Sequence, residues 1–382
     1  MLLAILLLSL FSIAYQHDTR LDKRWYSVDH LRKETRHLRG PWPNFYGDGT
    51  TPIRFCFEDE NSYDKLLALV QDAIGLWKPA LDVSTLTIEP SCGRGNWHCI
   101  CDEDTHWDTL TIVDVTDEEG GKTVATLGHK YVKPEDRERV DGRYTYHFLA
   151  VKRDEPEGFS RWWDLHGIAH EFGHVAGLDH EHQRPDAEKK GFWWNCDMLK
   201  DAASVRQRIA DREEGTYEEG DTFERACREF DMAYRYGFSA TAIMPKPAKL
   251  LGAGVRSKEL DWDSIMIYPS YRGEKRLSEE PKSVRFPEGA YIHRRYYEGT
   301  KIRDVELLPG HITVDPVTRR YDYSTVRISE GDIARIAQLY PRGKPAGGQA
   351  EAWEQAEDRK QAKGREQAED RKQAKGPEQA EA

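Results

Sequence analysis

The sequence predicts an α+β fold, in which a mixed β-sheet is backed by one helix and followed by a second helix that carries paired histidines. Apolar residues alternate with Arg54 and Cys56 over residues 53–57, which indicates a strand buried on one face. Apolar residues then recur at helical spacing over residues 61–77. His170 and His174 lie four residues apart in a later helical stretch and therefore share one helix face.

The elements of the first half follow one another along the chain. The helix after the first strand is expected to stop at Pro79, because proline lacks the N–H that a helix interior uses. Further strands are predicted over residues 85–89, 109–115 and 144–151. We expect these strands to form one sheet, with the histidine-bearing helix packed beneath it.

The histidine-bearing helix reads H-E-x-x-H, with Glu171 directly after the first histidine. Imidazoles four residues apart can both reach one ion at about 2.0–2.1 Å, the bond length of zinc to nitrogen. This short motif also occurs in helices that bind no metal. The apolar residues of the helix fall on the arc opposite the histidines: Leu165, Ile168, Ala169, Phe172, Val175 and Ala176.

A hydrolytic zinc needs a third protein ligand, since three ligands leave the fourth position for water. His166 shares the histidine face, but His166, His170 and His174 would span about 12 Å of straight helix, too far to converge on one ion. Gly177 can adopt the left-handed conformation that ends a helix, and His180 follows three residues later. The extended spacing H-E-x-x-H-x-x-G-x-x-H therefore predicts Zn²⁺ held by His170, His174 and His180.

This ligand set is expected to have a methionine turn downstream, and residues 264–268, S-I-M-I-Y, supply one. Together the two motifs resemble those of the astacin-type zinc metalloproteases, a family of the metzincins that carries S-I-M-x-Y. The match places Met266 and Tyr268 at the family's methionine and tyrosine.

The resemblance extends past the third ligand, where Glu181, Arg184 and Asp186 hold the family's glutamate, arginine and aspartate. Leu178 stands where the family usually has phenylalanine, and Ala187 where it often has arginine. Neither position binds the metal, so these departures concern packing or substrate and leave the chemistry intact.

The resemblance implies a metzincin-like, two-lobed catalytic domain whose second lobe is mostly irregular and is closed by a C-terminal helix. It implies that Met266 forms the floor beneath the metal, that Tyr268 is a swinging metal ligand able to stabilise an oxyanion, and that Glu181 meets the mature amino terminus. Glu171 is placed to take a proton from zinc-activated water and pass it to the leaving amine. The expected function is a secreted zinc endopeptidase.

A catalytically inactive, secreted metzincin-fold binding protein is the alternative, and the presence of Glu171, Tyr268 and all three histidines favours the enzyme. Among enzymes, Glu181 and the lack of glycine-aspartate calcium repeats argue against a matrixin or a serralysin. The net charge of −11 and the lack of a basic stripe argue against nucleic acid and anionic membranes as partners. Protein or peptide substrates are the expected partners.

Residues 125–128, A-T-L-G, resemble the segment that forms the cleft-edge strand in astacins. An unpaired sheet edge at this place would hold an extended peptide through main-chain hydrogen bonds. An internal turn that ends at Gly128 is the other interpretation.

Two segments are expected to precede the catalytic domain. Residues 1–14 are predicted to be a signal peptide, because they form an apolar run shorter than the roughly 20 residues of a membrane span and end in small residues. A buried strand or signal anchor is the alternative. Residues 15–39 suit a pro-segment, and Lys23-Arg24 is either a processing site or a solvated charge pair.

The catalytic domain is predicted to cover residues 40–341. Residues 45–48 resemble the F-x-G-D stretch that places an aspartate on zinc in astacin pro-segments, but a plain turn before the first strand is the other interpretation. Residues 342–382 carry a charged repeat, E-Q-A-E-D-R-K-Q-A-K-G, with almost no apolar residues to bury, so we expect a solvated tail or a marginal helix.

Residues 186–263 join the third ligand to the methionine turn and are mostly polar, with one helical stretch near residues 222–234. This segment either shapes the cleft or is plain surface. Ser329-x-x-Asp332 is a capping pattern that begins the closing helix, and Pro341 ends it.

The cysteines are even in number, which in a secretory context favours up to three disulfides of undetermined pairing. They are Cys56, Cys92, Cys99, Cys101, Cys196 and Cys227. A second zinc site at Cys92, His98, Cys99 and Cys101 is the alternative, but its spacing matches no standard finger. No N-x-S/T glycosylation sequon occurs.

Overall fold

A computed structural model provides the structure of the protein. It describes residues 26–27, 40–44, 49–130, 146–153, 160–247, 255–268, 292–298, 301–306, 313–314, 321–322 and 325–342. The predicted signal peptide, most of the pro-segment, residues 45–48 and the C-terminal repeats lie outside these residues. The domain boundaries therefore stay predictions. No helix among the described residues is long and apolar enough to cross a membrane.

The first lobe is built on a five-stranded sheet with the order β3-β2-β4-β6-β5. Four of its strands pair in parallel: β2 (Thr51–Phe57), β3 (Leu86–Pro90), β4 (Leu110–Asp114) and β6 (His147–Val151). The fifth, β5 (Val124–Ala125), runs antiparallel to β6 at the sheet edge. The sheet is therefore mixed, as predicted, and the predicted strands are present with shifts of one to three residues at their ends. Of residues 125–128, which resembled a cleft-edge strand, only Ala125 lies in β5, and Gly128 has a left-handed φ of 59°.

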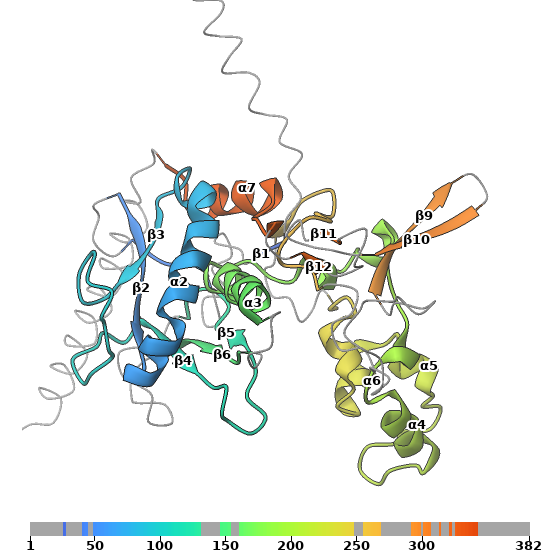
Figure 1. The fold of residues 1–382 in the computed structure, drawn as a ribbon. Coiled ribbons are helices and arrows are strands. Elements are labelled where there is room, and N and C mark those ends of the chain that lie inside the picture. Colours follow the sequence, from blue (N-terminus) through green and yellow to red (C-terminus); the bar gives the residue numbers. More distant parts are fainter. Residues whose placement is uncertain are drawn as a thin grey trace, which may run out of the picture.

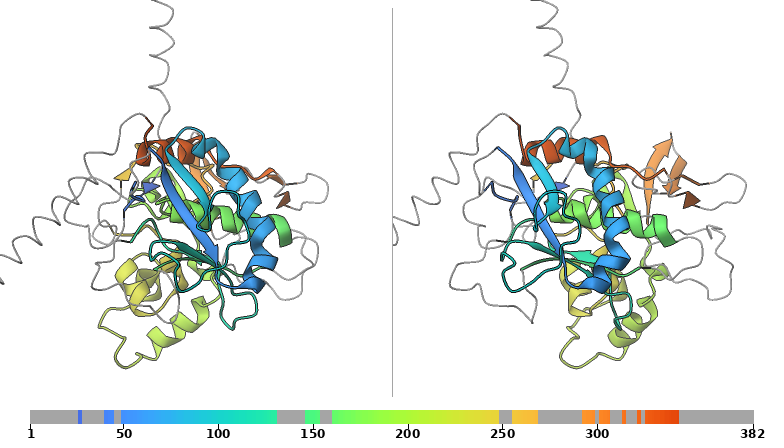
Figure 2. Two further views of the ribbon diagram at one scale, coloured as in Figure 1. Left: turned by 90° about the vertical axis from the view of Figure 1, so that its left-hand side faces the viewer. Right: turned by 60° about the vertical axis from the view of Figure 1, so that its left-hand side comes forward.

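Two helices, α2 (Glu60–Leu81) and α3 (Ser160–Val175), cover the same face of this sheet. Ile53, Phe55 and Phe57 of β2 are fully buried and share one core with the apolar sides of both helices. Figure 1 shows α3 beside α2, and Figure 2 shows α3 running behind β2 and α2 through the middle of the molecule. The helix predicted to carry the metal therefore lies in the interior of the molecule.

The prediction that Pro79 stops α2 is wrong, since the helix continues to Leu81. A proline in the last turn removes only the hydrogen bond that its own N–H would donate. The last turn of the helix is still closed by a backbone hydrogen bond, because the Asp82 N–H donates to the Lys78 carbonyl at 2.8 Å. One missing hydrogen bond is too small a loss to end a helix whose apolar face is buried.

The described part of residues 186–263 forms most of a second lobe with its own hydrophobic core. Its main elements are β7 (Phe192–Trp194), α4 (Ala202–Ala210), α5 (Phe223–Ala226) and α6 (Phe230–Arg235). Figure 1 shows this lobe on the opposite side of α3 from the sheet. The segment is therefore more than plain surface: its apolar residues are spread thinly along the sequence but converge in space.

The single helix predicted near residues 222–234 is two helices, α5 and α6. Thr222 caps α5 by accepting a hydrogen bond from the Arg225 N–H at 3.2 Å. The break follows at Cys227, whose sulfur is bonded to Cys196. This disulfide to another segment fixes the backbone at Cys227. The spacing of apolar residues in the sequence does not indicate such a bond.

The remaining elements are short. They are β1 (Tyr26–Ser27), η4 (Glu181–Gln183), η5 (Glu188–Lys190), η6 (Cys196–Met198), η7 (Ser239–Ala242), β8 (Val255–Arg256), β9 (Ile292–Glu298), β10 (Lys301–Glu306), β11 (Thr313–Val314) and β12 (Tyr321–Asp322). Strands β10, β9 and β7 form an antiparallel sheet, β1 pairs with β8, and β11 pairs with β12.

The closing helix α7 (Glu330–Leu339) returns to the first lobe and packs against α2. Ser329 caps it as predicted, because its hydroxyl oxygen accepts a hydrogen bond from the Asp332 N–H at 3.0 Å. Ile336 and Tyr340 are buried in the same core as the sheet.

All six cysteines are paired, as Cys56–Cys101, Cys92–Cys99 and Cys196–Cys227. The disulfide interpretation is therefore confirmed, and a second zinc site on these sulfurs is ruled out. His98 instead contacts Glu60, with 3.0 Å between its Nε2 and a carboxylate oxygen.

Candidate metal centre

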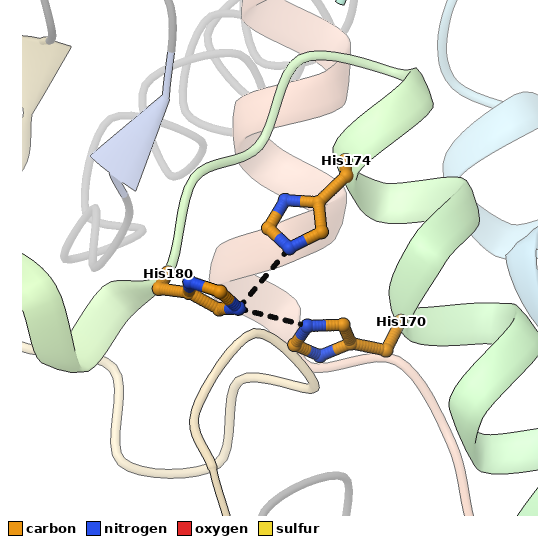
Figure 3. Close-up of side chains that lie close together, drawn as sticks. All are labelled: His170, His174 and His180. Atoms are coloured by element: carbon orange, nitrogen blue, oxygen red, sulfur yellow. Dashed lines mark hydrogen bonds between the residues drawn. The ribbon is translucent and has the colours of Figure 1, made fainter. Parts of the chain in front are cut away.

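The structure brings His170, His174 and His180 together at one point beside α3 (Figure 3). The Nε2 atom of His180 lies 3.1 Å from Nε2 of His170 and 3.1 Å from Nε2 of His174. His166 stays apart from this group, as predicted, and its ring stacks on Trp163 with 6.1 Å between ring centroids.

Hydrogen bonds on the far side of each ring fix the direction in which the two helical histidines face. Nδ1 of His170 donates to the Ile265 carbonyl at 2.7 Å, and Nδ1 of His174 donates to the Leu178 carbonyl at 2.8 Å. A carbonyl oxygen only accepts, so each Nδ1 carries the proton. Each Nε2 therefore presents an unprotonated lone pair.

His180 is fixed in the same way, but by a side chain. Its Nδ1 donates to Oε1 of Gln183 at 2.9 Å. The amide orientation of Gln183 is set in turn, because its Nε2 donates to the Thr241 carbonyl at 2.8 Å. Gln183 was not predicted to have a role, although its place three residues after the third ligand was a usable signal.

The three lone pairs, with the His180 nitrogen 3.1 Å from each of the other two, are all acceptors, so a cation is what satisfies them. Tetrahedral zinc with bonds of about 2.0–2.1 Å would hold its nitrogen ligands roughly 3.3 Å apart. Burial, together with neighbouring His174, lowers the pKa of His180 well below its ordinary value, which keeps the imidazole in the neutral form that binds metal. The donor set therefore fits Zn²⁺ and leaves a fourth position for water.

Gly177 turns the chain from α3 toward the third histidine, as predicted. Its φ of 98° lies in the left-handed region that favours glycine. The Gly177 N–H donates to the His174 carbonyl at 2.8 Å, and the Leu178 N–H donates to the Gly173 carbonyl at 2.8 Å. These two bonds close the helix end and aim the chain at His180.

Side chains from both ends of the described domain satisfy the last carbonyls of α3. The indole Nε1 of Trp42 donates to the Val175 carbonyl at 2.7 Å. The Tyr340 hydroxyl donates to the Ala176 carbonyl at 2.9 Å and accepts from the Trp42 N–H at 3.2 Å. Buried carbonyls at a helix end need such partners, so these residues hold the end of α3 in place.

The methionine turn packs directly against the backbone of α3. Met266 is buried, and a Cβ added at Gly173 would lie 2.4 Å from its sulfur and 3.1 Å from a ring carbon of Trp77. The Met266 carbonyl accepts from the Glu181 N–H at 3.2 Å, which joins the turn to the third-ligand segment. Gly173 is therefore required for this close approach, a role that the sequence analysis missed.

Tyr268 lies beside the histidines. Its ring centroid is 4.5 Å from that of His180 and 5.8 Å from that of His170. His182 holds the backbone of Tyr268, because Nδ1 of His182 accepts from the Tyr268 N–H at 3.3 Å. Nε2 of His182 donates to the Ala242 carbonyl at 3.2 Å. His182 also escaped the sequence analysis, because it lies between motif positions.

Glu171 follows His170 on α3 and is only 5% exposed. Its side chain is therefore held within the protein. The roles assigned to Glu171, Tyr268 and the three histidines nevertheless remain predictions about chemistry.

Glu181 is buried in a network of charges. Its carboxylate accepts from Arg184 Nη1 at 2.7 Å and from the Asp261 N–H at 3.0 Å, and Arg184 also binds Asp186 at 2.7 Å. The expected contact of Glu181 with a mature amino terminus depends on the cleavage point and stays a prediction. The three positions that extended the family resemblance thus form one ion-pair cluster, in which Glu181 and Arg184 are buried and Asp186 is half-buried.

Comparisons with known proteins give fold likeness at low identity. No protein-family model matches the sequence, and no curated protein matches it. High choriolytic enzyme 1, a hatching enzyme zinc-protease from Oryzias latipes (medaka fish), is similar at 13% identity and a TM-score of 0.40, over 83% of this chain and 100% of that one.

Two structures of myroilysin are similar at 13% and 14% identity, with TM-scores of 0.38 and 0.36, over 80% and 84% of this chain and 97% and 99% of theirs. The first neighbour is a zinc protease, the class that the sequence motifs resemble. At these TM-scores the likeness carries no argument about activity, which has to come from the site itself.

Replacing Gly173 with alanine tests the close packing of the methionine turn. The added methyl group would displace Met266, so we expect the free energy of unfolding to fall by about 1–3 kcal/mol. Gly167→Ala in the same helix is the control, because its Cβ would meet only a Thr123 methyl at an ordinary 3.7 Å. Urea denaturation of both variants checks the prediction, and equal stability of the two would contradict it.

Asp261 gives stability a pH dependence of known sign. Burial, and then the neighbouring Asp332 carboxylate, raise the pKa of Asp261 from 3.8 to about 7. Between these values the folded state keeps a proton that the unfolded chain releases, so the contribution of Asp261 to the unfolding free energy is lost as pH rises. We therefore expect Asp261→Asn to gain stability relative to wild type between pH 4 and pH 7. Denaturation curves across that range measure the difference, which a pH-independent offset would refute.

Proposed function

We propose that the protein is a secreted zinc endopeptidase that hydrolyses peptide bonds in protein or peptide substrates. The observation that carries this proposal is the convergence of three histidine lone pairs, each fixed by its own Nδ1 hydrogen bond, next to a buried glutamate. Three nitrogen ligands and one open position are typical of catalytic zinc, whereas structural zinc has four protein ligands.

Each side chain of the site has a distinct part in the proposed hydrolysis. Zinc, when bound, supplies a Lewis acid that acidifies water and polarises a carbonyl. Glu171 takes the proton from the attacking water and passes it to the leaving amine. Its burial shields this proton transfer from bulk solvent. Tyr268, anchored through its N–H by His182, donates a hydrogen bond from its hydroxyl to the oxyanion of the tetrahedral intermediate.

The sheet edge next to the site supports an extended peptide as the substrate. Within the described residues, β5 pairs with β6 along one side only, and Val124 on it is 45% exposed. The strand is fastened to the metal centre, because the Gly128 N–H donates to the His174 carbonyl at 2.8 Å. A substrate that adds to β5 through main-chain hydrogen bonds would lie at a fixed distance from the histidines.

Secretion is supported by the covalent structure as well as by the predicted signal peptide. Every cysteine of the chain is in a disulfide, and two of the three bonds, Cys56–Cys101 and Cys92–Cys99, lie in the first lobe. Disulfides persist in oxidising compartments and are rare in the cytosol.

The proposal predicts that Glu171→Gln abolishes most proteolysis without releasing the metal. Loss of a general base lowers kcat/KM by about 10²–10⁴-fold. The measurement is cleavage of casein or gelatin by purified protein with and without a chelator, beside the zinc content of each sample. Glu119→Gln, a change at an exposed glutamate, is the matched control.

Cleavage that survives the chelator would refute the zinc assignment, and cleavage by Glu171→Gln at the wild-type rate would refute the general base. A zinc-loaded wild type that cleaves no protein substrate would instead support the inactive binding protein.

Tyr268→Phe is expected to lower kcat by about 10²–10³-fold, the usual effect of losing one oxyanion donor, with little change in KM. Steady-state kinetics on a fluorogenic peptide separate the two parameters. Tyr234→Phe is the control, since Tyr234 is 75% exposed in the second lobe. A change in KM alone would show that Tyr268 contacts the substrate without assisting the chemistry.

A further inference from the structure

We propose that Asp332, in the first turn of the closing helix α7, is a positioning residue for the metal ligand His170. It acts through the methionine turn and touches no metal ligand itself. This inference rests on the proposed zinc site and names a residue that determines how firmly that site is held.

The first connection runs through Ile265. His170 Nδ1 donates to the Ile265 carbonyl at 2.7 Å, and the Ile265 N–H donates to Oδ2 of Asp332 at 3.0 Å. The residue that orients the ligand is therefore bound on its other side by the aspartate. Ile265 is fully buried and Asp332 is 2% exposed, so water does not compete for either bond.

A second connection reaches the peptide group whose carbonyl accepts from His170. The N–H of that same peptide belongs to Met266, and it donates to the Ser264 hydroxyl oxygen at 3.0 Å. The Ser264 hydroxyl donates in turn to Oδ1 of Asp332 at 2.7 Å. Carboxylate, hydroxyl, peptide and imidazole thus form one chain of hydrogen bonds, and such chains polarise their members cooperatively.

Asp332 has a fixed position from which to act. Its N–H is bound by the Ser329 hydroxyl oxygen at 3.0 Å, which caps α7, and Ile336 one turn further along is fully buried in the first core. The carboxylate is therefore attached to the rigid first lobe. Its hydrogen bonds to Ser264 and Ile265 fix the methionine turn, which joins the first lobe to the second.

A carboxylate suits this place because it accepts at both oxygens. The Ile265 N–H and the Ser264 hydroxyl are both buried donors, and an apolar side chain at residue 332 would leave them unsatisfied. Groups that hydrogen-bond a metal ligand are worth about 10–100-fold in metal affinity, and Asp332 holds the peptide group that does so for His170. Replacing the aspartate is therefore expected to lower the affinity for the metal more than it changes any other property of the site.

The test compares zinc affinity among full-length variants, by competition with a chromophoric chelator, and records the visible spectrum of the cobalt-substituted proteins. Asp332→Ala should bind zinc about 10–100-fold more weakly and shift the cobalt spectrum. Asp332→Asn keeps one acceptor for the Ile265 N–H and should recover most of the affinity. The cobalt spectrum separates the two roles, because a general loss of stability would leave the spectrum of the folded protein unchanged.

Asp59→Ala is the control for stability. Asp59 caps α2 by accepting from the Ser62 N–H at 2.7 Å, and it lies on the exposed start of that helix, away from the methionine turn. We expect this variant to melt at a lower temperature with unchanged zinc affinity and an unchanged cobalt spectrum. If it weakens zinc binding as much as Asp332→Ala does, the inference is overturned.

Wild-type affinity for Asp332→Ala would also overturn the inference. If Asp332→Ala does not fold, Ser264→Ala decides: it breaks the hydroxyl connection alone and should weaken zinc binding about 10-fold, whereas unchanged affinity would overturn the inference. Wild-type protein that binds no zinc would refute the proposed function instead, so the two failures are distinguishable.

Discussion

Three imidazole lone pairs directed at one another form the constraint on which the rest of the structure depends. In isolation they repel, so the protein has to hold them until a cation neutralises the repulsion. It does so with one Nδ1 hydrogen bond per ring, and the three acceptors come from different segments: Ile265 in the methionine turn, Leu178 after the glycine bend, and Gln183 in η4. The metal centre is therefore only as well ordered as these three segments are relative to one another.

The fold meets this requirement by binding the segments to both ends of the domain. Trp42 and Tyr340 close the end of α3 from opposite termini of the described catalytic domain, and Asp332 holds the methionine turn from α7. The Met266 carbonyl then links that turn to Glu181, directly after the third histidine. Stability and site geometry have the same origin here, because the residues that complete the core also complete the ligand supports.

The sequence was sufficient for the features that depend on local spacing. The histidine motif, the left-handed Gly177, the buried side of α3 and the Ser329 cap each involve residues a few positions apart, where helix geometry links sequence to space. The role of Asp332 and the cysteine pairing were beyond reach because their partners are set by tertiary packing. The second-lobe core was missed for the same reason, since short elements bury apolar residues that show no period.

The placement of α7 has a consequence for biosynthesis. All three histidines leave the ribosome long before residues 329–340, which supply the helix cap, the carboxylate behind the methionine turn and the tyrosine at the end of α3. A nascent chain thus contains every histidine of the cluster before the helix that holds the methionine turn and the end of α3 has been made. The arrangement described here is completed only when that final helix docks.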